Sequence, residues 1–135
     1  MRSFDEKFVP IKSLAELSKK LHQNKSKIVS TNGCFDILHL GHIQYLKEAK
    51  ALGDKLIVGI NADISVKKIK PKGRPVNSEN VRVQILAALE AVDYVTVFSE
   101  DTPEKFLSLL NTGLSSLQFM PFRVPCGQFT VFVYS

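Results

Sequence analysis

The sequence predicts an α/β fold in which parallel strands form a doubly wound sheet with helices on its faces. Short apolar runs alternate with amphipathic helical segments along most of the chain. The run 56–60 is continuously apolar between polar flanks, as in a strand that is buried on both faces of a sheet. The dipeptide Asn32-Gly33 forms a glycine turn between the first apolar run and the next helical segment.

Most of the expected elements have a local signal at one end. Ser13 and Glu16 have the spacing of a capping box at the start of a helix, and Gly53 is a stop signal for the next helix. Ser78 can cap a third helix, and Thr102, followed by a proline and an acid, can cap a fourth. In chain order we expect a helix over 13–23, a strand over 27–31, a helix over 41–51, a strand over 55–60, a helix over 78–91, a strand over 92–98 and a helix from 102.

The composition excludes several classes of protein. With 44% hydrophobic and 23% charged residues in 135, the chain fits one small globular domain. No apolar run approaches the roughly 20 residues that span a bilayer, and Asp5 and Glu6 interrupt the position of a secretory signal. We therefore expect a cytoplasmic protein without a membrane partner. The net charge of +5 suits a phosphorylated substrate but is too small and dispersed to indicate nucleic acid.

The last segment differs in composition from the rest. After Lys105 only Arg123 carries a formal charge, and phenylalanines crowd a stretch that two prolines interrupt. The run 131–134 could form a strand, but the periodicity is otherwise lost. The end of the chain therefore looks like a different kind of sequence from the rest.

The turn after the first predicted strand has the residue types of a phosphate site. Ligands of open parallel sheets bind beyond the carboxyl ends of the strands, where helix N-termini present unpaired N–H groups. Gly33 would let the chain reverse tightly, and Gly41 has no side chain to hold a phosphate away from the backbone. His39 and His42 would project from one face of the helix start and donate N–H to phosphate as largely neutral imidazoles. A chance pair of histidines and a metal-binding pair are the alternatives.

Two further loops, 61–77 and 98–102, open on the same edge. The first is basic and would either neutralise phosphates or form a solvated surface, and its position favours Lys70 and Arg74 as ligand contacts. Its other cations are Lys67, Lys68 and Lys72.

Among the remaining polar residues, Asp36 is favoured as the carboxylate of the pocket over Asp93, which could merely terminate a helix. Arg82 would contact an anionic substrate or form a surface pair with Glu79. We expect His22, Cys34 and Cys126 to be structural, since the two cysteines are too far apart in sequence for a CxxC motif.

Several motifs together resemble the cytidylyltransferase-like nucleotidyltransferases. Within that family, the run 28–111 looks most like the adenylyltransferase domains that form ADP-heptose from heptose 1-phosphate for lipopolysaccharide precursors. The resemblance implies a Rossmann-like fold of the His-x-Gly-His type. The motifs are Thr31-Asn32-Gly33-Cys34-Phe35-Asp36-Ile37-Leu38-His39, Leu40-Gly41-His42, Leu52-Gly53-Asp54-Lys55-Leu56-Ile57-Val58-Gly59, Arg74-Pro75-Val76-Asn77, Val92-Asp93-Tyr94-Val95 and Glu100-Asp101-Thr102-Pro103-Glu104.

This resemblance implies a reaction and roles for the residues. A sugar-phosphate oxygen would attack the α-phosphorus of ATP and release pyrophosphate, with His39, His42 and Lys70 as catalytic residues. Magnesium would be bound by the phosphates rather than by a cage of carboxylates. The implied nucleotide-binding residues are Gly33, Cys34, Phe35, His39, Leu40, Gly41 and His42, and the substrate side comprises Asp36, Asn61, Arg74 and Arg82.

The resemblance ends at Asn111, which implies a nucleotidyltransferase domain over 1–111, with the helix over 13–23 included, and a non-family C-terminal tail over 112–135. There the family continues with another strand, a Lys-Gly-rich acidic segment and a Ser-Thr-Thr motif that opens a helix over the nucleotide, and the present sequence has none of these. Part of the nucleotide site would then be absent. Two other functions therefore stay open: a cytidylyltransferase for glycerol 3-phosphate, and a nucleotide-binding remnant without turnover. The sequence also leaves open whether the chain forms a homodimer.

Overall fold

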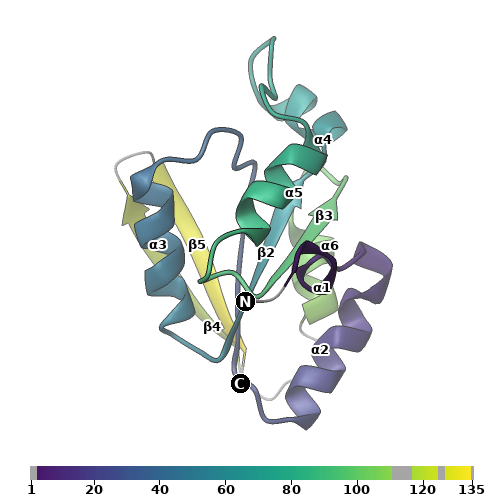
Figure 1. Cartoon of the computed structure of the whole chain (residues 1–135), viewed down its shortest axis with the longest axis vertical. Coiled ribbons are helices and arrows are strands. Elements are labelled where there is room, and N and C mark those ends of the chain that lie inside the picture. Colours follow the sequence, from purple (N-terminus) through teal and green to yellow (C-terminus); the bar gives the residue numbers. More distant parts are fainter. Residues whose placement is uncertain (1–2, 111–116, 125–126, 135) are drawn as a thin grey trace.

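The computed structural model describes residues 3–110, 117–124 and 127–134, with side chains for 3–110 and 131–134 (Figure 1). Cys126, which we expected to be a buried thiol, lies outside these ranges. The helices are α1 (Phe4–Lys7), the 3-10 turn η1 (Ile11–Ser13), α2 (Leu14–Gln23), α3 (Leu40–Lys50), α4 (Asp63–Ile69), α5 (Glu79–Ala87) and α6 (Glu104–Leu110). The strands are β1 (Ile28–Gly33), β2 (Lys55–Asn61), β3 (Tyr94–Phe98), β4 (Leu117–Val124) and β5 (Gly127–Tyr134).

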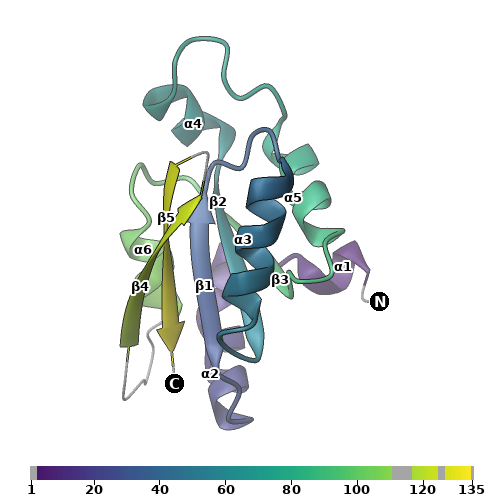
Figure 2. The same ribbon diagram turned by 90° about the vertical axis from the view of Figure 1, so that its left-hand side faces the viewer.

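The strands form one sheet in the order β3-β2-β1-β5-β4. β1 pairs in parallel with β2, and β2 pairs in parallel with β3, which confirms the predicted α/β core. The expected strand over 131–134 is also confirmed as part of β5. However, β5 is antiparallel to β1 and to β4, so the C-terminal segment extends the sheet as a hairpin and the sheet is mixed rather than wholly parallel (Figure 2).

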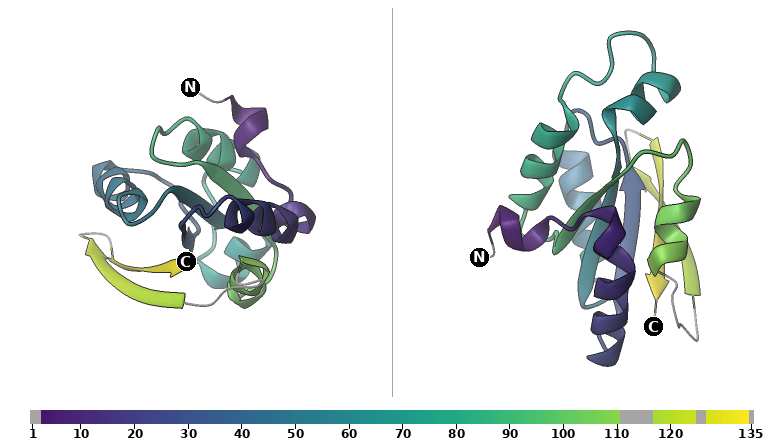
Figure 3. Two further views of the ribbon diagram at one scale, coloured as in Figure 1. Left: turned by 90° about the horizontal axis from the view of Figure 1, so that it is seen from below. Right: turned by 90° about the vertical axis from the view of Figure 1, so that its right-hand side faces the viewer.

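Two apolar clusters lie on opposite faces of the sheet, because successive side chains of a strand point to opposite sides. On β1, Val29 packs in the cluster with α3 and α5, whereas Ile28 packs in the cluster with α2 and α6. The views in Figure 3 show these helix pairs on the two sides of the sheet. At Gly59 a Cβ atom would lie 2.9 Å from the ring of Phe106, so the glycine lets α6 approach β2 closely.

The helices differ from the prediction in several places: α1 was not predicted, and α5 ends at Ala87 instead of residue 91. Ser13 makes no side-chain cap for α2, since a 3-10 turn precedes that helix instead. The segment 61–77 was predicted to be a loop but contains α4, a helix of 7 residues that is stabilised by burying Ser65 and Val66. The predicted cap of α5 is confirmed, because the Ser78 side chain accepts a hydrogen bond from the Val81 N–H. None of the helices in the described ranges has the length and apolar character needed to cross a bilayer.

Candidate active site

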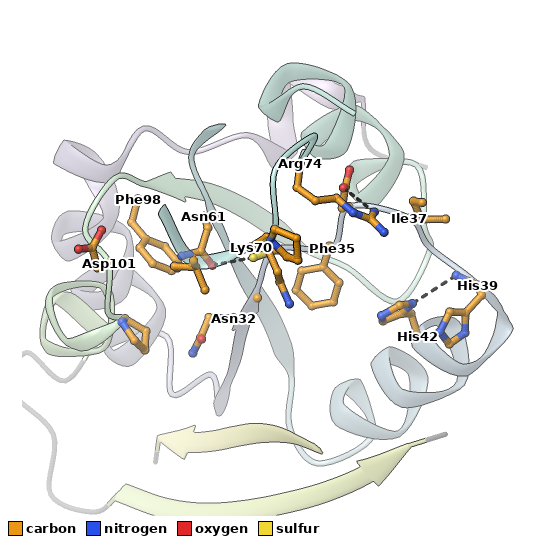
Figure 4. Close-up of a pocket in the computed structure, with 16 residues that line it drawn as sticks. Asn32, Phe35, Ile37, His39, His42, Asn61, Lys70, Arg74, Phe98 and Asp101 are labelled. Carbon is orange, nitrogen blue, oxygen red and sulfur yellow. Dashed lines mark hydrogen bonds and ion pairs between the residues drawn. The ribbon is translucent and has the colours of Figure 1, made fainter. Parts of the chain in front are cut away.

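A cavity of about 780 Å³ lies at the carboxyl ends of β1, β2 and β3 (Figure 4). Most of the residues predicted for the site line this cavity: Gly33, Cys34, Phe35, Asp36, His39, His42, Asn61, Lys70 and Arg74. Leu40, Gly41 and Arg82 were predicted with them but are not among the lining residues. The sequence did not single out Asn32, Ile37, Ile69, Pro71, Phe98, Asp101 and Pro103, which line the cavity as well.

The chain reverses at a different residue from the one predicted. Gly33 is the last residue of β1, and Phe35 carries the left-handed backbone angle, with φ of 48°. Such an angle is unfavourable for a bulky side chain unless its surroundings hold it. Phe35 is 5% exposed and packs in the apolar cluster beneath α3, so burial of the ring holds the turn in place.

The two histidines cap the start of α3. The Gly41 N–H donates to Nδ1 of His39 at 3.0 Å, and the His39 N–H donates to Nδ1 of His42 at 3.3 Å. A neutral imidazole that accepts at Nδ1 carries its proton on Nε2. The capping contacts therefore make Nε2 the donor in both rings.

The environment of His42 favours the neutral ring. Burial lowers the pKa of His42 from its usual value near 6.5, and electrostatic repulsion between the two rings, were both to take up a proton, lowers it further. The ring centroids of the two histidines are 4.1 Å apart, and the ring of Phe35 lies 5.8 Å from that of His42. At neutral pH the site thus holds an uncharged His42 that can donate a hydrogen bond.

Asp36 ties the turn to the loop that follows α4. Its carboxylate accepts the Val76 and Asn77 N–H groups, each at 2.8 Å, and Nη1 of Arg74 at 3.0 Å. Burial alone would raise the pKa of Asp36, but the hydrogen bonds from Asn77, Val76 and Arg74 outweigh burial and lower the pKa below its usual value. Asp36 and Arg74 line the cavity together, and the carboxylate positions the guanidinium there.

Replacing Asp36 with Asn should loosen this loop, since an amide cannot accept as strongly from three donors. We expect the free energy of unfolding to fall by about 1–3 kcal/mol at pH 7. The folded-state pKa is lowered, so the carboxylate stabilises the fold above pH 3.8 and loses this effect as the pH falls through the lowered value. Urea unfolding of both proteins at several pH values checks the prediction, and a difference that grew on acidification would contradict it.

Arg82 lies behind the cavity rather than in it. Its side chain has no exposed surface, and it forms an ion pair of 2.8 Å with Asp63 instead of the surface pair with Glu79. Nη1 donates to the carbonyl oxygens of Cys34 and Asn61 at 2.8 and 2.7 Å, and Nε donates to that of Asn77 at 3.0 Å. The guanidinium thus joins the ends of β1 and β2 to the start of α5.

Cys34 and Asn61 form the cavity wall at the ends of β1 and β2. The Cys34 thiol contacts Oδ1 of Asn61 at 3.8 Å. Burial raises the pKa of the thiol, although the charges of Lys70 and Arg82 oppose this effect. The thiol therefore stays protonated and acts as a weak hydrogen-bond donor.

Asp93 lies at the other end of β2. Its carboxylate accepts the Leu56 N–H at 2.8 Å and pairs with Lys50, so it holds the start of the strand. This position agrees with the preference for Asp36 in the pocket. Within the described residues no group of three or more His, Cys, Asp or Glu side chains could hold a metal ion.

The sequence of this chain is similar to a known family of proteins and to individual relatives. A family described as cytidylyltransferase-like matches residues 30–120. The bifunctional protein HldE of Campylobacter jejuni (serotype O:6, strain 81116) is 59% identical over 104 residues, which cover 77% of this chain and 23% of that protein. HldE of Aliarcobacter butzleri is 54% identical over 103 residues, which cover 74% of this chain and 22% of that protein. The chain thus spans about a fifth of these relatives.

One solved structure has a similar fold and a related sequence. It is the lipopolysaccharide core biosynthesis protein from Thermoplasma volcanium, with 36% identity and a TM-score of 0.58. The superposition covers 64% of this chain and 69% of that one.

Proposed function

This chain belongs to the cytidylyltransferase-like family of nucleotidyltransferases, and from that membership we propose that it transfers AMP from ATP to a sugar 1-phosphate. The proposed acceptor is heptose 1-phosphate, and the products are ADP-heptose and pyrophosphate. The observation that carries the proposal is the pair of capping histidines at the cavity, whose Nδ1 atoms accept backbone hydrogen bonds and whose protons are therefore on Nε2.

The reaction forms one bond and breaks another. An oxygen of the sugar phosphate attacks the α-phosphorus of ATP, and the bond from that phosphorus to the oxygen bridging to the β-phosphate breaks. No covalent enzyme intermediate is needed. Catalysis then comes from holding the reacting groups in line and from stabilising the charge that develops on the phosphate oxygens.

The residues around the cavity have the chemistry for this task. The Nε2 donors of His39 and His42 would bind phosphate oxygens of the transition state, and Lys70 would neutralise the charge of the triphosphate. Arg74, which Asp36 holds at 3.0 Å, would bind the acceptor phosphate. Magnesium would be bound by the phosphates of ATP and would add positive charge there, since the described residues offer no cluster for it.

Two observations support a sugar phosphate as the acceptor. The solved structure with 36% identity carries a name from lipopolysaccharide core biosynthesis, and lipopolysaccharide cores are built from sugars. The motifs quoted above also resemble ADP-heptose-forming domains. A cytoplasmic location is part of the proposal, because ATP and activated sugars are made and used there.

A substrate panel tests the proposed function. We expect pyrophosphate release with ATP and heptose 1-phosphate, and much less with CTP and glycerol 3-phosphate. The reverse preference would make the chain a cytidylyltransferase. Calorimetric binding of ATP without release of pyrophosphate under any condition would instead identify a nucleotide-binding remnant.

A further inference from the structure

The wall of the cavity contains a chain of hydrogen bonds that starts at Asn61 and ends at a backbone carbonyl. Nδ2 of Asn61 donates to Oγ of Ser65 at 2.9 Å, and this hydroxyl donates to the carbonyl oxygen of Glu100 at 3.1 Å. Ser65 is fully buried on α4, whereas Asn61 lines the cavity. These hydrogen bonds connect β2, α4 and the segment after β3.

The chemistry of the groups decides which atom donates in each of these hydrogen bonds. A carbonyl oxygen can only accept, so the single hydroxyl proton of Ser65 is directed to Glu100. The oxygen of Ser65 must then accept from its other neighbour, and only the amide nitrogen of Asn61 can donate to it. A flipped amide would place two oxygens in contact without a proton between them. The side-chain oxygen of Asn61 therefore faces Cys34, which also lines the cavity.

The cavity has two ends of different chemistry. Figure 4 shows His39 and His42 at one end and Asn61, Phe98 and Asp101 at the other. The first end has donors for phosphates. At the second end, the amide oxygen of Asn61 and the carboxylate of Asp101, which pairs with Lys68 at 3.9 Å, are acceptors that suit the hydroxyl groups of a sugar.

We propose that Ser65 is a positioning residue for the acceptor sugar: its hydroxyl orients the Asn61 amide so that the amide oxygen accepts a hydrogen bond from a sugar hydroxyl. This inference rests on the proposed function, because it takes a sugar phosphate as the occupant of that end. Ser65 itself does not line the cavity and acts only through Asn61.

Calorimetry with heptose 1-phosphate, in the presence of a non-hydrolysable ATP analogue, tests the proposal on the whole chain. We expect Ser65→Ala to weaken binding by about fivefold, the effect of losing one oriented hydrogen bond. Asn61→Ala should weaken it by a similar factor. The double variant should be no weaker than Asn61→Ala alone, since Ser65 has no other route to the ligand. Affinity for the ATP analogue should change less than twofold in all three proteins.

A matched control separates orientation from packing. Ser18 is also fully buried and donates to a backbone carbonyl, that of Leu110 at 2.9 Å, but it lies between α2 and α6 and does not line the cavity. Ser18→Ala should lower thermal stability without weakening heptose 1-phosphate binding. If Ser65→Ala does not fold, Asn61→Ala is compared with the unaltered protein on heptose 1-phosphate and on its singly deoxygenated analogues. The unaltered protein should then bind one of these analogues more weakly than it binds heptose 1-phosphate. Asn61→Ala should bind that analogue and heptose 1-phosphate equally well.

Each contrary result has a separate meaning. If the unaltered chain does not bind heptose 1-phosphate, both the proposed function and this inference are wrong. If it binds but Ser65→Ala binds equally well, or if the losses from Ser65→Ala and Asn61→Ala add, the role of Ser65 is wrong and the proposed function stands. If the ATP analogue is the ligand that loses affinity, the amide contacts the nucleotide rather than the sugar.

Discussion

Replacing His42 with Ala should lower kcat by about 10²- to 10³-fold, the usual effect of removing one donor that stabilises a charged transition state. His42 is 8% exposed and lines the cavity, so its Nε2 donor works in surroundings from which most water is excluded. The loss should appear in kcat more than in the KM for ATP, because developing charge is greatest in the transition state. The rate of pyrophosphate release in the reaction of ATP with heptose 1-phosphate measures kcat.

The substitution also removes part of the cap of α3, and this structural effect must be measured separately. The His39 N–H loses its acceptor, which costs about 0.5–2 kcal/mol of stability. Thermal unfolding shows whether the variant is folded at the assay temperature. His22→Ala is the matched control, since His22 does not line the cavity and should keep kcat within about twofold. A folded His42→Ala protein with undiminished kcat would refute the mechanism.

The pH dependence follows from the same residue. His42 must be neutral to keep its Nδ1 contact with the His39 N–H, and its pKa is lowered from 6.5. The rate should therefore fall on acidification with a midpoint below pH 6.5, as the ring takes up a proton. A profile of kcat/KM against pH checks this expectation, and a midpoint at or above pH 6.5 would contradict it.

The sequence correctly predicted that most of the candidate residues lie together, because the order of strands and loops decides which residues meet. A parallel sheet brings the ends of β1, β2 and β3 to one edge, so the turn with His39 and His42, the loop with Lys70 and the segment after Phe98 had to meet. The spacing of the two histidines, three residues apart, was enough to place both at the helix start.

The sequence could not predict features that depend on burial. Local preference favours Gly33 as the residue that reverses the chain, but the left-handed angle falls on Phe35, where the apolar cluster below the ring holds it. The helix α4 was missed because its 7 residues are too few for a periodic pattern and include two lysines. The buried face of α4, which carries Ser65, was therefore not predicted.

Replacing Arg82 with Met should lower the free energy of unfolding by about 3–5 kcal/mol, because removal of one partner leaves a buried network unsatisfied. The guanidinium is the donor for two carbonyl oxygens at the strand ends, those of Cys34 and Asn61, and the ion-pair partner of Asp63. Arg82→Lys should be nearly as damaging, since one ammonium group cannot reproduce the planar fork of donors. Urea unfolding measures both variants.

The control for Arg82 is Gln84→Met on the same helix, where the side chain is exposed and the change should stay within about 0.5 kcal/mol. The comparison also decides between two roles. From its sequence position, Arg82 was expected to contact an anionic substrate or to pair with Glu79. A substrate contact would mean that Arg82→Met weakens ligand binding while stability stays close to that of Gln84→Met. The buried contacts of Arg82 predict instead that Arg82→Met mainly lowers the free energy of unfolding. Ligand affinity should then fall only because the cavity walls formed by Cys34 and Asn61 lose their support.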